Sequence, residues 1–207
     1  MQGLHEKHSE RHHNWPVAPQ YEFLADAIWK DFAYGKNAVY DGGHHGNAIL
    51  SKYPIVRWDN EDISMHDSER RGLLHCEIAM PGWSKNLHCI NVHLGLLGHW
   101  RKKQMLRMKE RIDKLVPEDA PMVIAGDFND WRRMASDSLV GALNVYEVFE
   151  ATGGRPARSF PAILPMLHLD RIYVRGFSVE LAHAHHGHSW SRVSDHIALS
   201  ARLVRNV

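Results

Sequence analysis

The chain has 207 residues, of which 44% are hydrophobic and 24% are charged. These values are typical of a globular domain with its own core, and they exclude a disordered, fibrous or membrane-embedded chain. The 25 basic and 24 acidic residues give a net charge of +1, so a polyanion would need a local basic patch rather than an overall positive field.

Membrane and export signals are not visible in the sequence. No stretch approaches the roughly 18 consecutive apolar residues of a membrane-spanning helix, and residues 1–20 lack an apolar signal core. Cys76 and Cys89 are too few for a disulfide scaffold or a four-thiolate zinc site, so we expect them to pack in the core. We expect a cytoplasmic protein without an integral membrane segment, although a start upstream of Met1 would reopen the question of a signal peptide.

The hydrophobic pattern of the first half predicts one helix followed by strands. Apolar residues at helical spacing, Tyr21, Leu24, Ile28 and Phe32, predict a helix between Pro19 and Gly35. Alternation over 73–80 predicts a strand with one buried face, and a turn at 81–86 joins it to a strand over 87–92 in a hairpin. Two further strands are predicted at 37–40 and 47–51.

The second half continues as a mixed α/β pattern. Apolar residues from Met105 to Val116 share one face of a predicted helix over 99–116, which Pro117 ends. The apolar run 122–125 is typical of a buried central strand. Three more strands are predicted at 171–174, 178–184 and 197–203. Because there is no repeat or linker, we expect one domain over 1–207.

Polar residues follow the predicted strands where open α/β sheets place their sites. His93 ends one strand, Asp127 and Asn129 follow another, and Asp170 and the Asp195-His196 pair precede two more. Carboxylate oxygens suit a hard divalent cation, and carboxylate, amide and imidazole groups can orient water and contact phosphate. This set favours phosphoester hydrolysis, although a lone Asp-Phe-Asn is most often only an Asx turn.

The ordered set resembles the endonuclease/exonuclease/phosphatase superfamily, the DNase I-like fold, and its small bacterial members. The resemblance rests on the sequence 46–55, on 91–96 followed by Arg101 and Gln104, and on the three later motifs in the same order. It implies a four-layered α/β sandwich of two packed mixed sheets flanked by helices, a Mg²⁺ or Mn²⁺ cofactor, and a phosphoester substrate such as a nucleic acid, nucleotide or lipid headgroup.

The resemblance also implies catalytic roles. Asp127 would orient or deprotonate the attacking water, with Asn129 beside it. His196 would contact the scissile phosphate while Asp170, hydrogen-bonded to it, would favour the imidazolium. His93 matches a position at which relatives contact the phosphate.

Metal and substrate positions follow from the same resemblance. Asp195 is expected as a metal ligand together with Asp127 and Asn129. Asn47 and Arg71 are weaker candidates for substrate binding, and Arg71 is about as well explained as a solvated charge. Arg101 and Gln104 are expected to brace the first turn of their helix.

The start of the chain departs from the family pattern. Family members begin with a strand carrying Asn, a helix, and a second strand ending in Gln-Glu, whose Glu is the principal metal ligand. Here Met1 to Leu4 look like the stretch just after that Gln-Glu, and Glu6, Glu10 and Glu22 do not match it. We therefore expect an N-terminally truncated pattern, an unpaired strand edge and weaker metal binding.

Two other functions remain open on the sequence. The first is an inactive scaffold or binding module of the same fold. The second is a transition-metal protein built on some of the 17 histidines, notably His44 and His45 or the cluster His183, His185, His186 and His188. A serine hydrolase is disfavoured because no Gly-x-Ser-x-Gly elbow occurs. A basic patch for nucleic acid could form on one helix from Lys102, Lys103, Arg107, Lys109 and Arg111.

Overall fold

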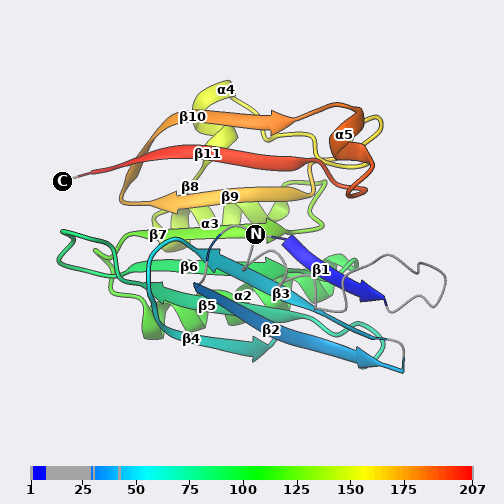
Figure 1. The fold of residues 1–207 in the computed structure, drawn as a ribbon, viewed down its shortest axis with the longest axis horizontal. Helices are drawn as coiled ribbons and strands as arrows, with labels where there is room; N and C mark the ends of the chain where they lie inside the picture. The colour runs from blue at the N-terminus through cyan, green and yellow to red at the C-terminus, as the bar shows by residue number, and fades with distance from the viewer. Residues whose placement is uncertain (1, 8–28, 30, 42, 207) are drawn as a thin grey trace.

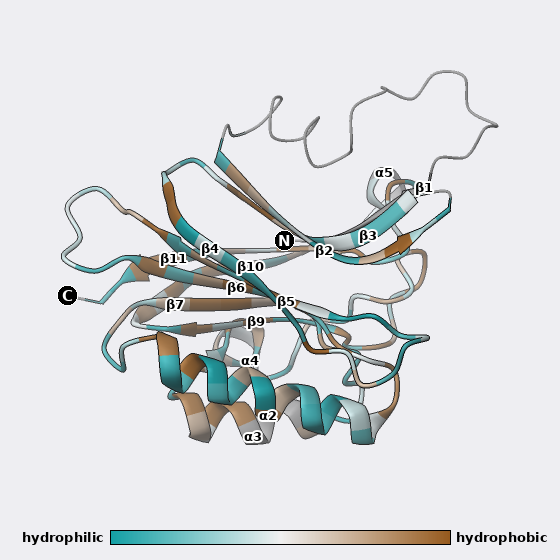
Figure 2. Ribbon diagram, turned by 90° about the horizontal axis from the view of Figure 1, so that it is seen from below, coloured by the Kyte–Doolittle hydropathy of each residue, from teal (hydrophilic) through white to brown (hydrophobic). Residues whose placement is uncertain are grey.

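The fold is a mixed α/β sandwich built on one six-stranded sheet (Figure 1). The computed structural model describes residues 2–7, 29, 31–41 and 43–206. Helices α2 (Gly98–Leu115) and α3 (Met134–Leu143) lie on one face of this sheet, and two smaller sheets lie on the other (Figure 2). The predicted fold class is confirmed. Within the described ranges, no helical layer covers the outer face of the smaller sheets.

The six-stranded sheet has the order β4-β5-β6-β7-β9-β8. Only the β6–β7 pair is parallel, and the other pairs are antiparallel. The strands are β4 (Ile55–Asp62), β5 (Gly72–Ile78), β6 (Leu87–His93), β7 (Met122–Asp127), β8 (Tyr146–Glu147) and β9 (Asp170–Arg175). The predicted hairpin is therefore β5–β6, and the predicted central strand is β7.

Strand β5 is buried on both faces, so the prediction of a single buried face is wrong. Leu73 packs in the core beneath α2, whereas Leu74 and Cys76 pack against β2 and β3. The polar residues His75 and Glu77 produce the alternating sequence pattern. Because the sheet is covered on both faces, the side chains on both faces of β5 are nevertheless buried. Cys76 and Cys89 face each other across β5 and β6 as free, buried thiols, as expected of core residues.

The smaller sheets cover the face opposite α2 and α3. One has the order β1-β3-β2, from β1 (Gln2–Lys7), β2 (Asp31–Tyr40) and β3 (Gly43–Ser51), and the other pairs β10 (Phe177–His185) with β11 (Ala198–Arg205). The short helices α4 (Val148–Gly153) and α5 (His188–Ser191) complete the described elements. Each small sheet has its own core against the large one, around Ile49 and Leu74 for the first and around Val174 and Phe177 for the second.

Two expectations about the first 40 residues change. The predicted helix between Pro19 and Gly35 lies mostly outside the described residues, and its last part is wrong because Asp31–Tyr40 form β2, whose Ala33 packs against Ile49. Residues 2–7, for which no strand is predicted, form β1 and pair with the edge of β3. That pairing supplies hydrogen-bond partners that a strand edge otherwise lacks.

In the described part of the chain, no helix has the length and apolar character that crossing a membrane requires.

A buried histidine pair lies beneath the C-terminal half of α2. His75 Nε2 lies 2.9 Å from His88 Nδ1, and both side chains are buried. Burial, and then the charge of His88, lowers the pKa of His75 to about 4, and burial also lowers the pKa of His88. One nitrogen of the pair must donate and the other accept, so the pair fits the neutral form.

The neutral pair predicts a loss of stability in mild acid. As pH falls from about 6.5 toward 4, the unfolded chain takes up a proton at residue 75 that the folded chain refuses, so the free energy of unfolding falls by up to about 1.4 kcal/mol per pH unit from this group. Urea unfolding at several pH values should show a shallower acid slope for His75→Gln, whereas His99→Gln, at an exposed position on α2, should keep the wild-type slope. Equal slopes for wild type and His75→Gln would contradict the prediction.

Candidate active site

Three predicted site residues form a row across neighbouring strands. His93, at the end of β6, is paired in register with Asp127, at the end of β7, and Asp127 is paired with Asp170, at the start of β9. Side chains in register on adjacent strands lie on the same face of a sheet, about 5 Å apart. Here this is the face that the smaller sheets cover, because Ile124 and Tyr173, one step out of phase, pack beneath the helices.

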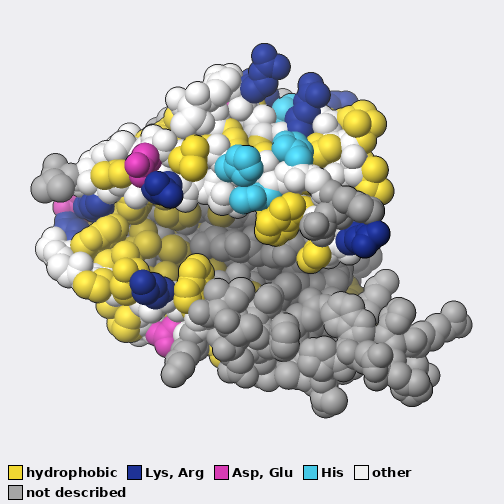
Figure 3. All heavy atoms as spheres, turned by 45° about the horizontal axis from the view of Figure 1, so that its top comes forward, with side chains coloured by type: hydrophobic (Ala, Val, Ile, Leu, Met, Phe, Trp, Pro, Cys, Tyr) yellow, Lys and Arg dark blue, Asp and Glu magenta, His cyan; other side chains and the backbone are white. Residues whose placement is uncertain are grey.

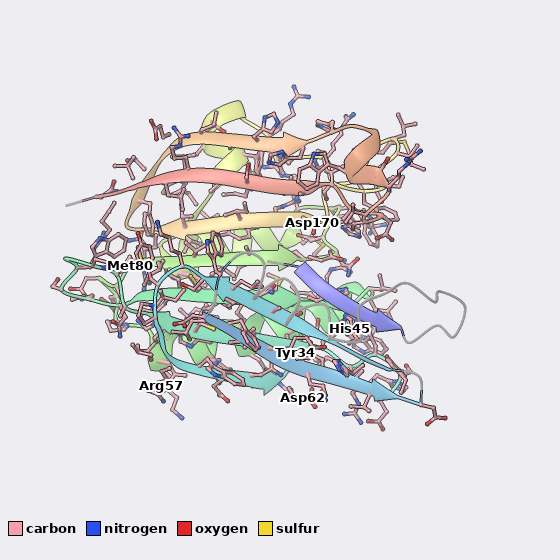
Figure 4. The ribbon with its side chains drawn as sticks, in the orientation of Figure 1. Tyr34, His45, Arg57, Asp62, Met80 and Asp170 are labelled. Carbon is pink, nitrogen blue, oxygen red and sulfur yellow. The ribbon has the colours of Figure 1, made fainter. Side chains whose placement is uncertain are left out.

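The row lies where the two smaller sheets approach each other. From β3, the His45 ring contacts the His93 ring edge to face, with centroids 5.4 Å apart. From the segment before β11, His196 bonds to Asp170. Figure 4 labels His45 and Asp170 toward the same end of the molecule, far from Arg57 and Met80. Residues from β3, β6, β7, β9 and the β11 approach therefore converge on one site.

Asp127 is held by the turn that follows β7. Its Oδ1 accepts the Asn129 N–H at 2.8 Å, and its Oδ2 lies 3.5 Å from His93 Nε2. Asn129 has a left-handed φ of 50°, which Asn tolerates better than most residues, and its Nδ2 donates to the Leu94 carbonyl at 2.8 Å. The motif is thus an Asx turn, and this turn leaves Asp127 Oδ2 and Asn129 Oδ1 without a backbone partner in the described residues.

Asp170 and His196 form the predicted pair. His196 Nδ1 donates to Asp170 Oδ2 at 2.7 Å, which leaves His196 Nε2 for another partner. Asp170 is fixed in turn, because its N–H donates to the buried Ser159 Oγ at 3.1 Å. The Phe160 ring packs against the imidazole at 5.0 Å. The segment 159–160 therefore orients both members of the pair.

The electrostatic coupling of these groups shifts two pKa values. Burial, and then the negative charge of Asp170, raises the pKa of Asp127 to about 7, against the opposing effects of the Asn129 N–H, His196 and Arg71. Burial disfavours the charged form of His196, but the hydrogen bond and charge of Asp170, aided by Asp127 and Asp195, outweigh it and raise its pKa to about 9. The site therefore combines a strengthened base with a retained imidazolium.

Arg71 faces the site rather than solvent. Its side chain is only 14% exposed, and Nη2 lies 3.3 Å from Glu69 Oε1. The charge of Asp127 opposes the lowering of the Arg71 pKa by burial, which shows that the two groups interact. The solvated-charge interpretation of Arg71 is therefore wrong. Glu69 also anchors the segment after β6, because it accepts the Leu96 N–H at 3.0 Å.

Asn47 is fully buried and ties the two sheet layers together. Its Nδ2 donates to the carbonyls of Gly72 and Asn91, at 2.8 and 3.2 Å, and Asn91 Nδ2 returns a bond to the Ala48 carbonyl at 2.9 Å. This placement does not fit direct contact with substrate. We assign Asn47 to holding β3 against the strands that carry the site.

The predicted metal ligands are only partly assembled. Asp127 and Asn129 lie together, but Asp195 is exposed and makes no hydrogen bond through its side chain within the described residues. Among those residues, no group of three or more His, Cys, Asp and Glu side chains is arranged to hold a metal. The oxygen donors of Asp127 and Asn129 and the nearby charge of Asp170 suit a hard cation, so the chain presents part of such a site.

The other sequence candidates have separate places. Arg101 donates to the carbonyls of Gly95 and Leu96, and Gln104 accepts the Gly95 N–H at 2.8 Å, so both brace the start of α2 as predicted. Of the predicted basic patch, Lys109 is paired with an acid on α2, and Arg111 is paired with Asp59 and Glu61. Three cations, Lys102, Lys103 and Arg107, remain exposed there.

The histidine clusters do not form a transition-metal site in the described chain. His44 Nδ1 lies 2.8 Å from the Tyr34 hydroxyl, and His185 Nε2 lies 2.8 Å from Ser200 Oγ. His183 contacts the His185 ring at 4.7 Å between centroids. These contacts involve hydroxyl groups and rings, without the acids or thiolates that would complete a ligand set.

Sequence reasoning missed the residues that support the site. Ser159, Phe160 and Glu69 act through contacts with residues 11, 36 and 27 positions away in the chain. Such contacts depend on how loops fold back, and no local pattern signals them.

Comparison with known proteins identifies the family of the chain. Residues 4–196 match the model of the Endonuclease/Exonuclease/phosphatase family, so the chain belongs to that family. It is 46% identical over 203 residues to the uncharacterized protein YbhP of Escherichia coli strain K12, which covers 98% of this chain and 80% of that relative.

Two solved structures share the fold at low sequence identity. A mannosyl-6-phosphatase of Bacteroides thetaiotaomicron matches with a TM-score of 0.66 and 17% identity, over 89% of this chain and 81% of that one. TDP2 of D. rerio, complexed with a single-strand DNA product, matches with a TM-score of 0.64 and 21% identity, over 90% of this chain and 82% of that one. These likenesses establish the DNase I-like architecture.

Proposed function

We propose that the protein is a divalent-metal-dependent phosphoesterase that hydrolyses a phosphodiester or related phosphoester by in-line attack of water. One observation carries the proposal. Asp127, with one carboxylate oxygen held and the other left for water, lies in register with Asp170, which holds His196 as an imidazolium. A base beside a cation on one sheet edge is the minimum that such chemistry requires.

Each residue of the site has a separate proposed role. The Asn129 N–H fixes Asp127 Oδ1, so Oδ2 faces outward to orient a water and accept its proton. His196, oriented by Asp170, places its Nε2–H to donate to a phosphate oxygen as negative charge develops there. Arg71 adds a second positive charge next to Asp127. His93 lies 3.5 Å from the carboxylate and limits its position.

A hard cation such as Mg²⁺ or Mn²⁺ would bind the oxygen donors of Asp127 and Asn129, with Asp195 as a further proposed ligand. When bound, it supplies charge neutralisation for the phosphate and would lower the Asp127 pKa again. Among the described residues, no group of three or more His, Cys, Asp and Glu side chains is arranged to hold a metal, so Asp127 and Asn129 supply part of the proposed site.

The substrate class is proposed from chemistry and from relatives together. The mannosyl-6-phosphatase and the DNA-bound TDP2 share the fold, and both names concern phosphate esters. The site itself presents the positive charges of His196 and Arg71 for a phosphate, the group that all phosphoesters share. We therefore propose a phosphoester in general, with nucleic acid, nucleotide and lipid headgroup as its possible carriers.

The incomplete ligand group favours one second candidate, a binding module of the same fold that holds a phosphate without hydrolysing it. In that case His196 and Arg71 would still attract the anion, but no cation would complete the reaction. Activity separates the two candidates directly.

The test is hydrolysis of bis-p-nitrophenyl phosphate by the purified chain. We expect turnover with Mn²⁺ or Mg²⁺, a loss of at least about 100-fold after EDTA treatment, and recovery when the metal is returned, because the cation stabilises the transition state by several kcal/mol. Full activity in EDTA would contradict the metal requirement. A folded protein without activity under all conditions would favour the binding module.

A further inference from the structure

A second cationic site lies beside the candidate active site, in an open cavity of about 590 Å³ between the segment 155–168 and the end of β10. Its lining contains five basic side chains and no acidic one. The basic residues are Arg155, Arg158, His168, His183 and His186. Figure 3 shows histidine side chains gathered beside Lys or Arg side chains on the face that carries β10 and β11.

The arginines of this cavity lack carboxylate partners. Arg155 and Arg158 are exposed and form no ion pair or hydrogen bond with any described residue. Most other arginines of the chain are neutralised or bonded, as Arg133 is by Glu150 and Arg202 by Glu180. Two unpaired guanidinium groups at the edge of one cavity can together bind a phosphate in bidentate fashion.

The floor of the cavity is apolar and fixed. Phe149 of α4 and Ala182 and Ala184 of β10 line it, and they belong to or pack against the core around Val174. An apolar floor with a cationic rim fits a phosphorylated organic group better than a bare ion, because the floor can cover the group that bears the phosphate.

The segment that lines the cavity is also hydrogen-bonded to the residues of the candidate active site. His168 Nδ1 lies 3.0 Å from the Ala157 carbonyl, and this contact links the two ends of the segment 157–168. Ser159, inside this segment, accepts the N–H of Asp170, and its carbonyl accepts the Ile197 N–H at 2.9 Å. His168 lies two positions before Asp170, so their Cα atoms lie at most about 7 Å apart.

We propose that this cavity, which we call the basic pocket, binds a phosphate group other than the one that is hydrolysed. Resting on the proposed phosphoesterase function, this makes the preferred substrate an organic molecule with at least two phosphate groups, one at His196 and one in the basic pocket. The pocket binds through Arg155 and Arg158, with His168, His183 and His186 as further polar groups in its lining.

Binding is tested first, without catalysis. Calorimetric titration with inorganic pyrophosphate in EDTA removes any contribution from a divalent metal at the active site. We expect the double variant Arg155→Gln/Arg158→Gln to bind at least tenfold more weakly than wild type. The matched control Lys102→Gln/Lys103→Gln removes the same charge from exposed positions on α2, and it should bind within twofold of wild type. Thermal unfolding checks that both variants are folded.

The substrate preference is tested next. For wild type we expect kcat/KM to be at least tenfold higher for adenosine 3′,5′-bisphosphate than for adenosine 5′-monophosphate, and the double arginine variant should lose this ratio. Absence of pyrophosphate binding, or equal weakening in both double variants, would overturn the basic pocket. Pyrophosphate binding through the arginines in a protein that hydrolyses nothing would support the pocket and refute only the phosphoesterase.

Discussion

Replacing Asp127 by Asn is expected to lower turnover of bis-p-nitrophenyl phosphate by between about 10² and 10⁴, because a neutral amide cannot accept the proton of the attacking water. The substitution keeps the shape of the side chain and an oxygen to accept the Asn129 N–H. Its effect should therefore appear in kcat, while the fold and the position of Asn129 are preserved.

The control for this prediction is another carboxylate of the same kind. Asp113 lies on α2, paired with Lys109 and away from the site, so Asp113→Asn should retain activity within about twofold. Unfolding in EDTA at pH 8 adds a second readout. Asp127→Asn should be at least as stable as wild type, because it removes a charge that burial and Asp170 disfavour. Activity within tenfold of wild type would remove Asp127 from the proposed role.

The sequence predicts the central elements because their patterns are strong. Strand β7 is a short apolar run between Pro121 and Gly126, and α2 carries an apolar stripe that buries Met105, Met108 and Ile112. Polar residues directly after a buried strand lie at the end of the sheet where that strand ends, whatever the rest of the fold. This explains why His93, Asp127 and Asp170 are found in register, whereas the contact between His196 and Asp170 is expected only from the family resemblance.

The elements that the sequence misses have weak or misleading local patterns. Strand β4 carries charged residues at an edge of the sheet, where the chain has no need of an alternating apolar face. Helix α3 contains Gly141 and shows only Leu139 and Leu143 as buried described residues. In β2, Phe32 continues a helical spacing by coincidence, whereas the packing of Ala33 against the second sheet decides the strand.

The candidate active site likewise depends partly on local structure and partly on contacts between distant segments. The Asx turn of Asp127 and Asn129 is local and can be anticipated from the sequence. The burial of Arg71 beside Asp127, the role of Asn47 between sheets and the bracing by Ser159 depend on tertiary contacts across 11 to 56 residues. The basic pocket belongs to this second group, since its arginines and histidines come from separate segments.

The junction of β7 with the turn that holds Asp127 leaves no room for a side chain at Gly126. Gly126 has a φ of 146°, and a Cβ built there would lie 1.9 Å from the Val92 carbonyl oxygen of the neighbouring strand. Gly126 and Val92 are paired in register on β7 and β6, so neither residue can move without disturbing the β6–β7 ladder. Because backbone strain at such positions alone costs about 1–3 kcal/mol, we expect Gly126→Ala to lower the free energy of unfolding by at least about 3 kcal/mol.

Gly141 provides the matched control, because it lies in α3 with open space where a Cβ would be placed. Gly141→Ala should raise the free energy of unfolding by about 0.5–1 kcal/mol, as expected for removing Gly from a helix interior. Urea unfolding of both variants at pH 7.5 gives the comparison, and an effect of Gly126→Ala below 1 kcal/mol would mean that the turn can relax. In that case Asp127 would not be held rigidly, and the preorganisation on which the proposed activity depends would have to come from Asn129 and Leu94 instead.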